Sequence, residues 1–169
     1  FEAALPWNLT DKVALVTGAA RGIGRSTVIA MAHAGADVVG VDRSHAELDE
    51  LVATVQRMGR RGLAISTDLS DPRAPAHVIE SCVAEFGRLD IVVNVAGCVI
   101  RKRAEDTMAE DWDTVLALNV KTMAEMCRLA LPYLRKNAGA NIVNMSSITG
   151  TVGTPLRAAY AATKAAILG

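Results

Sequence analysis

Apolar residues in this chain gather in short runs, and the longer stretches between the runs show apolar positions at helical spacing. Five runs are rich in Val, Ile, Leu and Ala, without the polar alternation of a half-exposed strand. Such runs of about four to eight residues are typical of strands buried on both faces of a parallel sheet. The predicted strands are residues 12–18, 36–42, 62–68, 90–97 and 140–147.

The intervals between these strands carry helical patterns. Two of the helices start with a predicted capping box, in which a hydroxyl residue is followed three positions later by a glutamate: Ser44 with Glu47, and Thr107 with Glu110. The predicted helices cover residues 23–35, a segment from 44 onward, about 72–87, 107–136, and 158 to the last residue.

Strand and helix alternate along the whole chain. This order predicts right-handed crossovers and a parallel sheet covered by helices on both faces, a three-layer α/β/α domain. We expect a doubly wound, Rossmann-like sheet with strand order 3-2-1-4-5, in one domain over residues 1–169 with residues 1–11 as an N-terminal extension. In such sheets ligands bind outside the carboxyl ends of the strands.

Composition narrows the class of partner. Lys plus Arg number 18 and Asp plus Glu number 18, so the net charge is zero and favours neither a nucleic acid nor an anionic membrane. No apolar run approaches the ~18 residues of a membrane helix. The cysteines and histidines are scattered, which favours reduced thiols in a cytoplasmic protein and predicts no metal site. They are Cys82, Cys98, Cys127, His33, His45 and His77.

A glycine-rich turn, "TGAARGIG", joins the first predicted strand to the first helix. Glycine lets the backbone approach a ligand closely, and a helix N-terminus favours a phosphate. Asp42 ends the next strand 42 − 24 = 18 residues after Gly24, where a carboxylate can hold ribose hydroxyls. The turn therefore predicts a dinucleotide site. The alternative is a tight structural turn without a ligand.

Tyr160 and Lys164 are four residues apart, so a helix places them on one face. A tyrosine is a poor acid or base at neutral pH, and a neighbouring ammonium favours its phenolate form. The pair predicts proton transfer in the interconversion of a carbonyl and an alcohol. Ser147 lies 160 − 147 = 13 residues before Tyr160, and its neighbour Ser146 is expected to point the other way.

Together, the turn G-x-x-x-G-x-G after Thr17 and the Ser147, Tyr160 and Lys164 pattern resemble the short-chain dehydrogenase/reductase family over residues 12–169. The resemblance implies a hydride transfer between a nicotinamide cofactor and a carbonyl or secondary alcohol. Tyr160 would give or take the proton, Lys164 would bind the nicotinamide ribose, and Ser147 would bind the substrate oxygen. Asn119 would complete a catalytic tetrad by holding a water in the proton relay.

The resemblance also implies a set of cofactor contacts. They are Thr17, Gly18, Arg21, Gly22, Ile23, Gly24, Asp42, Arg43, Asp68, Leu69, Asn94, Ala96, Gly97, Tyr160 and Lys164. Asp42 favours NAD because its carboxylate repels a ribose 2′-phosphate, whereas Arg21 and Arg43 favour NADP. The prediction is NAD, with NADP as the alternative. One departure from the family pattern is Val95, which replaces the second Asn of N-N-A-G and is expected to alter the sheet only locally.

Residues 97–122 resemble the gluconate and deoxygluconate dehydrogenases of the family. This favours a sugar acid or polyol as substrate, with a carboxylate bound by Arg101 in the run Arg101–Arg103; a solvated basic loop is the alternative. Ser147 and Thr149 are the other predicted substrate residues. Reduction of 3-oxoacyl thioesters, steroids or other ketones remains open, as does a dinucleotide-binding subunit without turnover.

Members of the family commonly form homodimers or homotetramers through the helices that hold Asn119 and Tyr160. The resemblance therefore implies a homodimer or homotetramer here. Family members also continue beyond the Tyr160 helix into further strands, so we expect the C-terminal part of the family domain to be missing from these residues.

Overall fold

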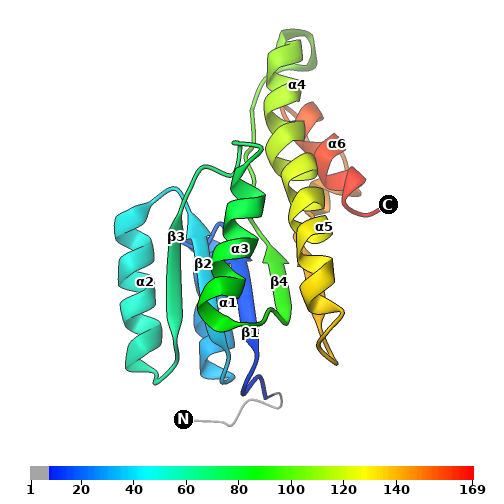
Figure 1. The fold of residues 1–169 in the computed structure, drawn as a ribbon. Coiled ribbons are helices and arrows are strands. Elements are labelled where there is room, and N and C mark those ends of the chain that lie inside the picture. Colours follow the sequence, from blue (N-terminus) through cyan, green and yellow to red (C-terminus); the bar gives the residue numbers. More distant parts are fainter. Residues whose placement is uncertain (1–7) are drawn as a thin grey trace.

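A five-stranded parallel sheet forms the centre of the computed structural model, which describes residues 8–169 (Figure 1). Its order is β3-β2-β1-β4-β5, as predicted. Residues 1–7 of the predicted N-terminal extension lie outside the described residues. The strands are β1 (Val13–Thr17), β2 (Asp37–Asp42), β3 (Gly62–Ser66), β4 (Ile91–Asn94) and β5 (Asn141–Asn144).

Helices cover both faces of this sheet. One face packs against α1 and α2, the opposite face packs against α3 and α5, and α6 lies against α4 (Figure 1). The helices are α1 (Gly22–His33), α2 (His45–Arg57), α3 (Ala74–Phe86), α4 (Ala109–Leu116), α5 (Met123–Leu134) and α6 (Ala158–Ala166). Shorter helical turns are η1 (Ala104–Asp106), η2 (Ala117–Thr122) and η3 (Ile148–Gly150).

The core is divided by the sheet because successive strand residues point to opposite faces. In β1, Val13 and Leu15 join the cluster with α3 and α5, and Ala14 and Val16 join the cluster with α1 and α2. All four are buried. Burial on both faces explains why β1 is a continuous apolar run. The packing on both faces also fixes the carboxyl end of the strand, where the glycine turn begins.

The helix starts differ from the predicted capping boxes. Ser44 is the residue before α2, but its hydroxyl donates to the Glu47 carboxylate and caps no backbone N–H. The helix α4 starts after Met108, whose N–H donates to Asp111 Oδ2 at 2.9 Å, so Asp111 replaces the predicted Glu110. The acidic residue is found one position later because the chain first makes the turn η1.

The predicted helix 107–136 is not a single α-helix. Its middle, η2, is a π-helical turn, in which the Thr122 hydroxyl donates to Ala117 O at 3.0 Å and to Leu69 O at 2.8 Å. A π-turn widens the helix and is frequent at functional sites. It holds Asn119, so the residue that resembles the family's catalytic asparagine lies where the helix is least regular.

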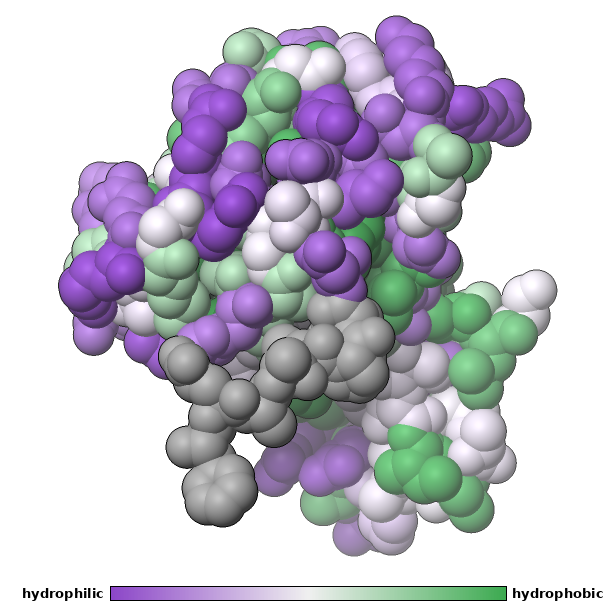
Figure 2. All heavy atoms as spheres, turned by 90° about the horizontal axis from the view of Figure 1, so that it is seen from below, coloured by the Kyte–Doolittle hydropathy of each residue, from purple (hydrophilic) through white to green (hydrophobic). Residues whose placement is uncertain are grey.

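The surface is polar over most of the view in Figure 2, and apolar side chains gather toward one side of it. At the edge of the sheet, β5 leaves the Val143 side chain 47% exposed. Within residues 8–169, every helix is too short or too polar to cross a membrane.

Candidate active site

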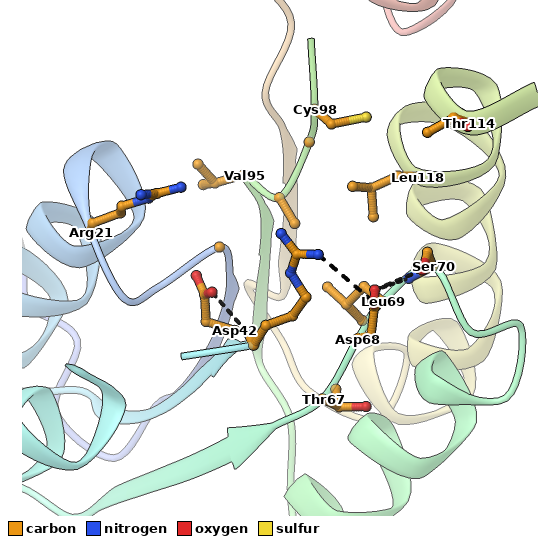
Figure 3. A pocket seen from close by; sticks show the side chains of 14 residues that line it. Arg21, Asp42, Thr67, Asp68, Leu69, Ser70, Val95, Cys98, Thr114 and Leu118 are labelled. Carbon is orange, nitrogen blue, oxygen red and sulfur yellow. Dashed lines mark hydrogen bonds and ion pairs between the residues drawn. The ribbon is translucent and has the colours of Figure 1, made fainter. Parts of the chain in front are cut away.

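A cleft of about 380 Å³ opens at the carboxyl ends of β1 to β4 (Figure 3). It lies where the chain leaves β1 toward α1 on one side and leaves β4 toward α4 on the other, the position at which such sheets bind ligands. It is lined by Gly18, Arg21, Asp42, Arg43, Thr67, Asp68, Leu69, Ser70, Val95, Ala96, Gly97, Cys98, Thr114 and Leu118.

The glycine turn after β1 needs glycine for reasons of space. A Cβ on Gly18 would lie 3.0 Å from the Cα of Ala96, and a Cβ on Gly24 would lie 2.0 Å from Gly18 O. Gly22 has φ +55°, with no atom within 4 Å of its Cβ position. The first turn of α1 has neither a side-chain cap nor an acidic residue, so its N–H groups are available to an anion.

Thr17 supports this turn from below and does not line the cleft. Its side chain is buried, and its Oγ1 accepts hydrogen bonds from Val95 N and Ala96 N, both at 3.1 Å. The contact ties the end of β1 to the loop after β4. Thr17 was predicted as a cofactor contact, and the structure gives it a positioning role.

Asp42 lies beside the turn with both carboxylate oxygens held by backbone N–H groups. Oδ1 accepts from Arg43 N at 2.7 Å and Oδ2 from Ala20 N at 3.1 Å. Arg43 lines the cleft, and its Nη1 lies 3.8 Å from Asp68 Oδ2. Hydrogen bonds from the backbone and hydroxyl of Ser70 hold the pKa of Asp68 below its ordinary value.

Lys164 and Tyr160 share one face of α6, as the spacing predicts. The Lys164 Nζ lies 5.8 Å from the centroid of the Tyr160 ring and donates to Met145 O at 2.6 Å. Only 4% of Lys164 is exposed, and this burial lowers the pKa of its ammonium. The result is a desolvated positive charge next to a phenol.

Asn119 braces the two segments on either side of it. Its Oδ1 accepts from Cys98 N at 2.8 Å, and its Nδ2 donates to Cys98 O at 2.9 Å and to Thr163 Oγ1 at 3.0 Å. The Thr163 hydroxyl in turn donates to Tyr160 O at 2.7 Å. Both amide hydrogens of Asn119 are thus used within the protein, and the implied contact with a water in the proton relay stays a prediction.

The adjacent serines have different partners. Ser146 Oγ donates to Lys164 O at 2.7 Å, which fixes the strand end to α6. Ser147 Oγ accepts from Thr149 N at 3.2 Å and from Thr149 Oγ1 at 2.9 Å, so its own hydroxyl hydrogen remains available. Thr149 is buried. It was predicted to touch the substrate, and its place here is to orient Ser147.

Several predicted cofactor residues lie outside the cleft. Ile23 is exposed on α1, and the Asn94 side chain turns toward β5, where its Nδ2 donates to Asn144 Oδ1 at 2.9 Å and approaches Cys127 Sγ at 3.5 Å. Asn94 therefore joins two strands and is not among the residues that line the cleft, and its contact with a cofactor stays a prediction. Gly22 and Gly24 lie in the first turn of α1 and are not among the residues that line the cleft.

Six cleft residues were not predicted as site residues, although one of them, Val95, lies in the family motif after β4. They are Thr67, Ser70, Val95, Cys98, Thr114 and Leu118. Four come from loops after strands, and the other two come from α4 and η2, which only the tertiary fold brings to the cleft. Across residues 8–169, no group of three or more His, Cys, Asp or Glu side chains is placed to hold a metal ion.

The three basic residues after β4, Arg101 to Arg103, have different surroundings. Lys102 pairs with Asp111 at 2.6 Å, and Arg103 pairs with Glu105 at 2.5 Å. Arg101 is exposed and is the member of the run without an ion pair in the described part of the chain.

Comparison with known proteins identifies the group to which this architecture belongs. The profile of the short chain dehydrogenase family matches residues 12–169. The 2-dehydro-3-deoxy-D-gluconate 5-dehydrogenase of Dickeya dadantii is 37% identical over 164 residues, which is 96% of this chain and 64% of that protein. The 3-oxoacyl-[acyl-carrier-protein] reductase of Thermotoga maritima is 35% identical, over 95% of this chain and 65% of its own length.

Two further similarities agree with these. A tropinone reductase homolog of Datura stramonium is 37% identical over 95% of this chain and 60% of its own length. The crystal structure of a candidate short-chain alcohol dehydrogenase from Sinorhizobium meliloti superposes with a TM-score of 0.91 at 37% identity, covering 96% of this chain and 64% of that one. The chain thus spans less than two thirds of the length of these relatives. With its glycine turn, its sheet order and the Tyr160–Lys164 helix, the chain belongs to the short chain dehydrogenase family.

Proposed function

We propose that the protein is an oxidoreductase that transfers a hydride between NAD and a secondary alcohol or carbonyl, with Tyr160 as the general acid and base. The observation that carries the proposal is the buried Lys164 ammonium 5.8 Å from the Tyr160 ring. The turn η3, which directly follows Ser147, packs on the same helix. A Cβ on Gly150 in this turn would lie 2.7 Å from Lys164 O.

The residues present fit a dinucleotide. The uncapped first turn of α1 and the open space at Gly22 leave room and N–H donors for a pyrophosphate. Asp42 lies at the end of β2 in the same cleft and offers carboxylate oxygens to ribose hydroxyls. Lys164 Nζ lies 3.8 Å from the Cβ position of Gly97, so its ammonium faces the loop after β4.

NAD is proposed over NADP because of the charges at the far end of the cleft. The Asp42 carboxylate is held in place by two backbone N–H groups, whereas Arg43 is 76% exposed and already directed to Asp68. A fixed negative charge opposes a 2′-phosphate more strongly than a flexible guanidinium attracts one. Arg21, which also lines the cleft, is the residue that favours NADP.

The chain's own residues provide proton transfer and orientation. Bound NAD supplies the acceptor of the hydride. Tyr160, beside the Lys164 ammonium, would accept the alcohol proton as a phenolate during oxidation and return it as a phenol during reduction. The Ser147 hydroxyl, oriented by Thr149, donates to the substrate oxygen and stabilises the charge that develops there.

The proposed substrate is a sugar acid or polyol. Two observations support it: the relative named 2-dehydro-3-deoxy-D-gluconate 5-dehydrogenase, and the exposed Arg101 in the loop after β4, which forms no ion pair within residues 8–169. An arginine binds a carboxylate through two parallel hydrogen bonds. A 3-oxoacyl thioester or another ketone is the second candidate, favoured by the similarity to the Thermotoga reductase.

Two finer points complete the proposal. Assembly as a homodimer or homotetramer would use the helices around η2 and α6, which flank the site. Action in the cytoplasm agrees with the three free cysteines, of which Cys82 is fully buried with its pKa raised by burial to about 12.

Steady-state kinetics test the proposal directly. A panel of sugar acids, polyols, 3-oxoacyl thioesters and ketones is assayed with NAD(H) and NADP(H), and kcat/KM is expected to be at least tenfold higher with NAD(H). Tyr160→Phe should lower kcat by about 10²–10⁴-fold with cofactor affinity retained, since it removes only the transferable proton. A preference for NADP(H) would refute the weight given to Asp42, and cofactor binding without turnover on any substrate would indicate a non-catalytic subunit.

A further inference from the structure

Two loops border the part of the site that holds Ser147 and Tyr160: residues 98–103 after β4, and residues 151–157 before α6. A main-chain hydrogen bond joins them, from Lys102 N to Leu156 O at 3.1 Å. The Lys102 side chain also forms an ion pair with Asp111 at 2.6 Å, in the first turn of α4. Lys102 therefore connects three segments that are far apart in the sequence.

The partner of Lys102 is itself held. Asp111 is only 15% exposed, and its Oδ2 accepts a second hydrogen bond from Met108 N at 2.9 Å at the start of α4. The hydrogen bond from Lys102 is the main reason that the pKa of Asp111 lies below its ordinary value. An ion pair that is partly buried and shares a helix start is better ordered than a solvated surface pair.

Leu156 has an unusual backbone conformation. Its φ is +63°, in the left-handed region that costs a residue with a Cβ and favours glycine. Among residues 8–169, the other non-glycine residue with positive φ is Asp11, far from the site. Such a conformation persists where the surroundings impose it, and it is found at functional sites. Here the Lys102 N–H holds the Leu156 carbonyl two residues before α6 begins.

Tyr160, in the first turn of α6, is thus held from two sides. From within, Asn119 holds Thr163, whose hydroxyl holds Tyr160 O. From the loop side, the Lys102–Leu156 contact fixes the chain that enters the same turn. The loop 98–103 is also anchored at its other end, where Asn119 holds Cys98.

Building on the proposed function, we propose that Lys102 and Leu156 are positioning residues, whose contact clamps the first turn of α6 and holds Tyr160 in place for proton transfer. The middle residue of the basic run then serves the architecture of the site, and Arg101 is left for a substrate carboxylate. The basic run by itself does not indicate that Lys102 has a different role from Arg101 and Arg103. Its contacts with Asp111 and Leu156 distinguish it.

The first test uses the ion pair. Lys102→Met removes the pair and is expected to lower kcat about tenfold or more, because a small displacement of a reacting group is costly, with the KM for the cofactor unchanged. Lys102→Arg keeps the charge and should restore kcat. Arg61→Met is the matched control: it removes an ion pair of 2.6 Å with Glu85 at the opposite end of the sheet and should leave kcat unchanged.

The second test uses the backbone of Leu156. Leu156→Pro cannot adopt φ +63°, because the proline ring fixes φ at about −65°, so it must displace the carbonyl that Lys102 N holds. Leu156→Gly adopts the observed φ without steric cost and keeps that carbonyl in place. The expected result is a several-fold loss of kcat in Leu156→Pro and a smaller loss in Leu156→Gly.

Amide hydrogen exchange of the peptide covering residues 151–162 gives a readout independent of activity. Exchange should be faster than in the wild type for Lys102→Met and Leu156→Pro, and unchanged for Arg61→Met. Unchanged exchange in the first two variants would overturn the clamp, and faster exchange with unchanged kcat would overturn its role in placing Tyr160. Absence of turnover in the wild type would count against the proposed function alone, since the exchange measurement does not depend on it.

Discussion

The two ends of the candidate site are constructed differently. At the cofactor end, one short segment, the glycine turn, meets Asp42 from the next strand, and the contacts are between backbone atoms or from backbone N–H to carboxylate. At the proton-transfer end, Asn119 of η2 is joined to the loop after β4 and to α6, which carries Tyr160 and Lys164, by side-chain hydrogen bonds across 21 and 44 residues of sequence.

This difference determines how each end can fail. Gly18 and Gly24 of the turn have no space for a Cβ, so an added carbon at either position forces backbone atoms apart. The Asn119 network has no excess donors, so a lost side chain leaves buried polar groups without partners. The first kind of damage acts through steric overlap and the second through unsatisfied hydrogen bonds, and the following variants test this contrast.

The largest effect is expected for Gly24→Ala. Its Cβ would lie 2.0 Å from Gly18 O, a backbone atom that cannot rotate away, so the cost should reach or exceed the ~3 kcal/mol upper end of ordinary overpacking. Urea denaturation measures the loss of unfolding free energy. Gly59→Ala is the control: φ is +75° but no atom lies within 4 Å, so only the backbone penalty of about 1 kcal/mol applies. Equal costs for the two variants would contradict a turn limited by space.

A smaller but still large effect is expected for Asn119→Ala. The change leaves the N–H and C=O of Cys98 without a partner and removes the donor to the Thr163 hydroxyl oxygen, at a cost of about 2–4 kcal/mol in unfolding free energy. Asn141→Ala loses one exposed hydrogen bond to Gly139 O and should cost less than about 0.5 kcal/mol. If the two variants unfold at the same urea concentration, Asn119 is not a brace.

The smallest effect is expected in the pH dependence of stability. Burial lowers the pKa of Lys164 below its ordinary value of 10.5, so the folded state binds this proton less tightly than the unfolded state. The buried charge therefore costs stability at neutral pH, and the cost disappears as the pH rises through the folded-state pKa toward 10.5.

Lys164→Met should remove that rise in unfolding free energy, measured by urea denaturation between pH 7 and 10. Lys121→Met, which removes an exposed ammonium from η2, is the control and should keep the wild-type slope. A wild-type slope in Lys164→Met would mean that the charge is not buried at a cost, and that the two ends of the site do not differ in this respect.

Much of the fold could be predicted because the signals are local. Apolar runs predicted all five strands, and their alternation with helices predicted the order confirmed in the sheet. The predicted ends were less accurate: β4 ends at Asn94 and not at Gly97, and α3 begins at Ala74 and not near Pro72. Strand ends depend on the partner strand, which periodicity alone does not contain.

The site shows the same limit. The positions of Tyr160 and Lys164 on one helix face follow from their spacing. The contacts of Thr163 with Tyr160 and of Thr149 with Ser147 do not follow from any spacing. No spacing rule links Lys102 to Leu156. Asn94 was assigned to the cofactor from the family pattern, and its actual partners on β5 and α5 could not be inferred from that pattern.

By itself, the sequence determined the elements, the parallel order of the sheet, the turn that must be glycine and the spacing of the phenol and the ammonium. These are properties of neighbouring residues, fixed by steric limits on the backbone and by helical and strand periods. Only the tertiary structure decided which side chains hold Ser147 and Tyr160, and which of the basic residues after β4 has no ion pair within residues 8–169. Those outcomes depend on hydrogen bonds and burial between distant segments, which exist only after the chain has folded.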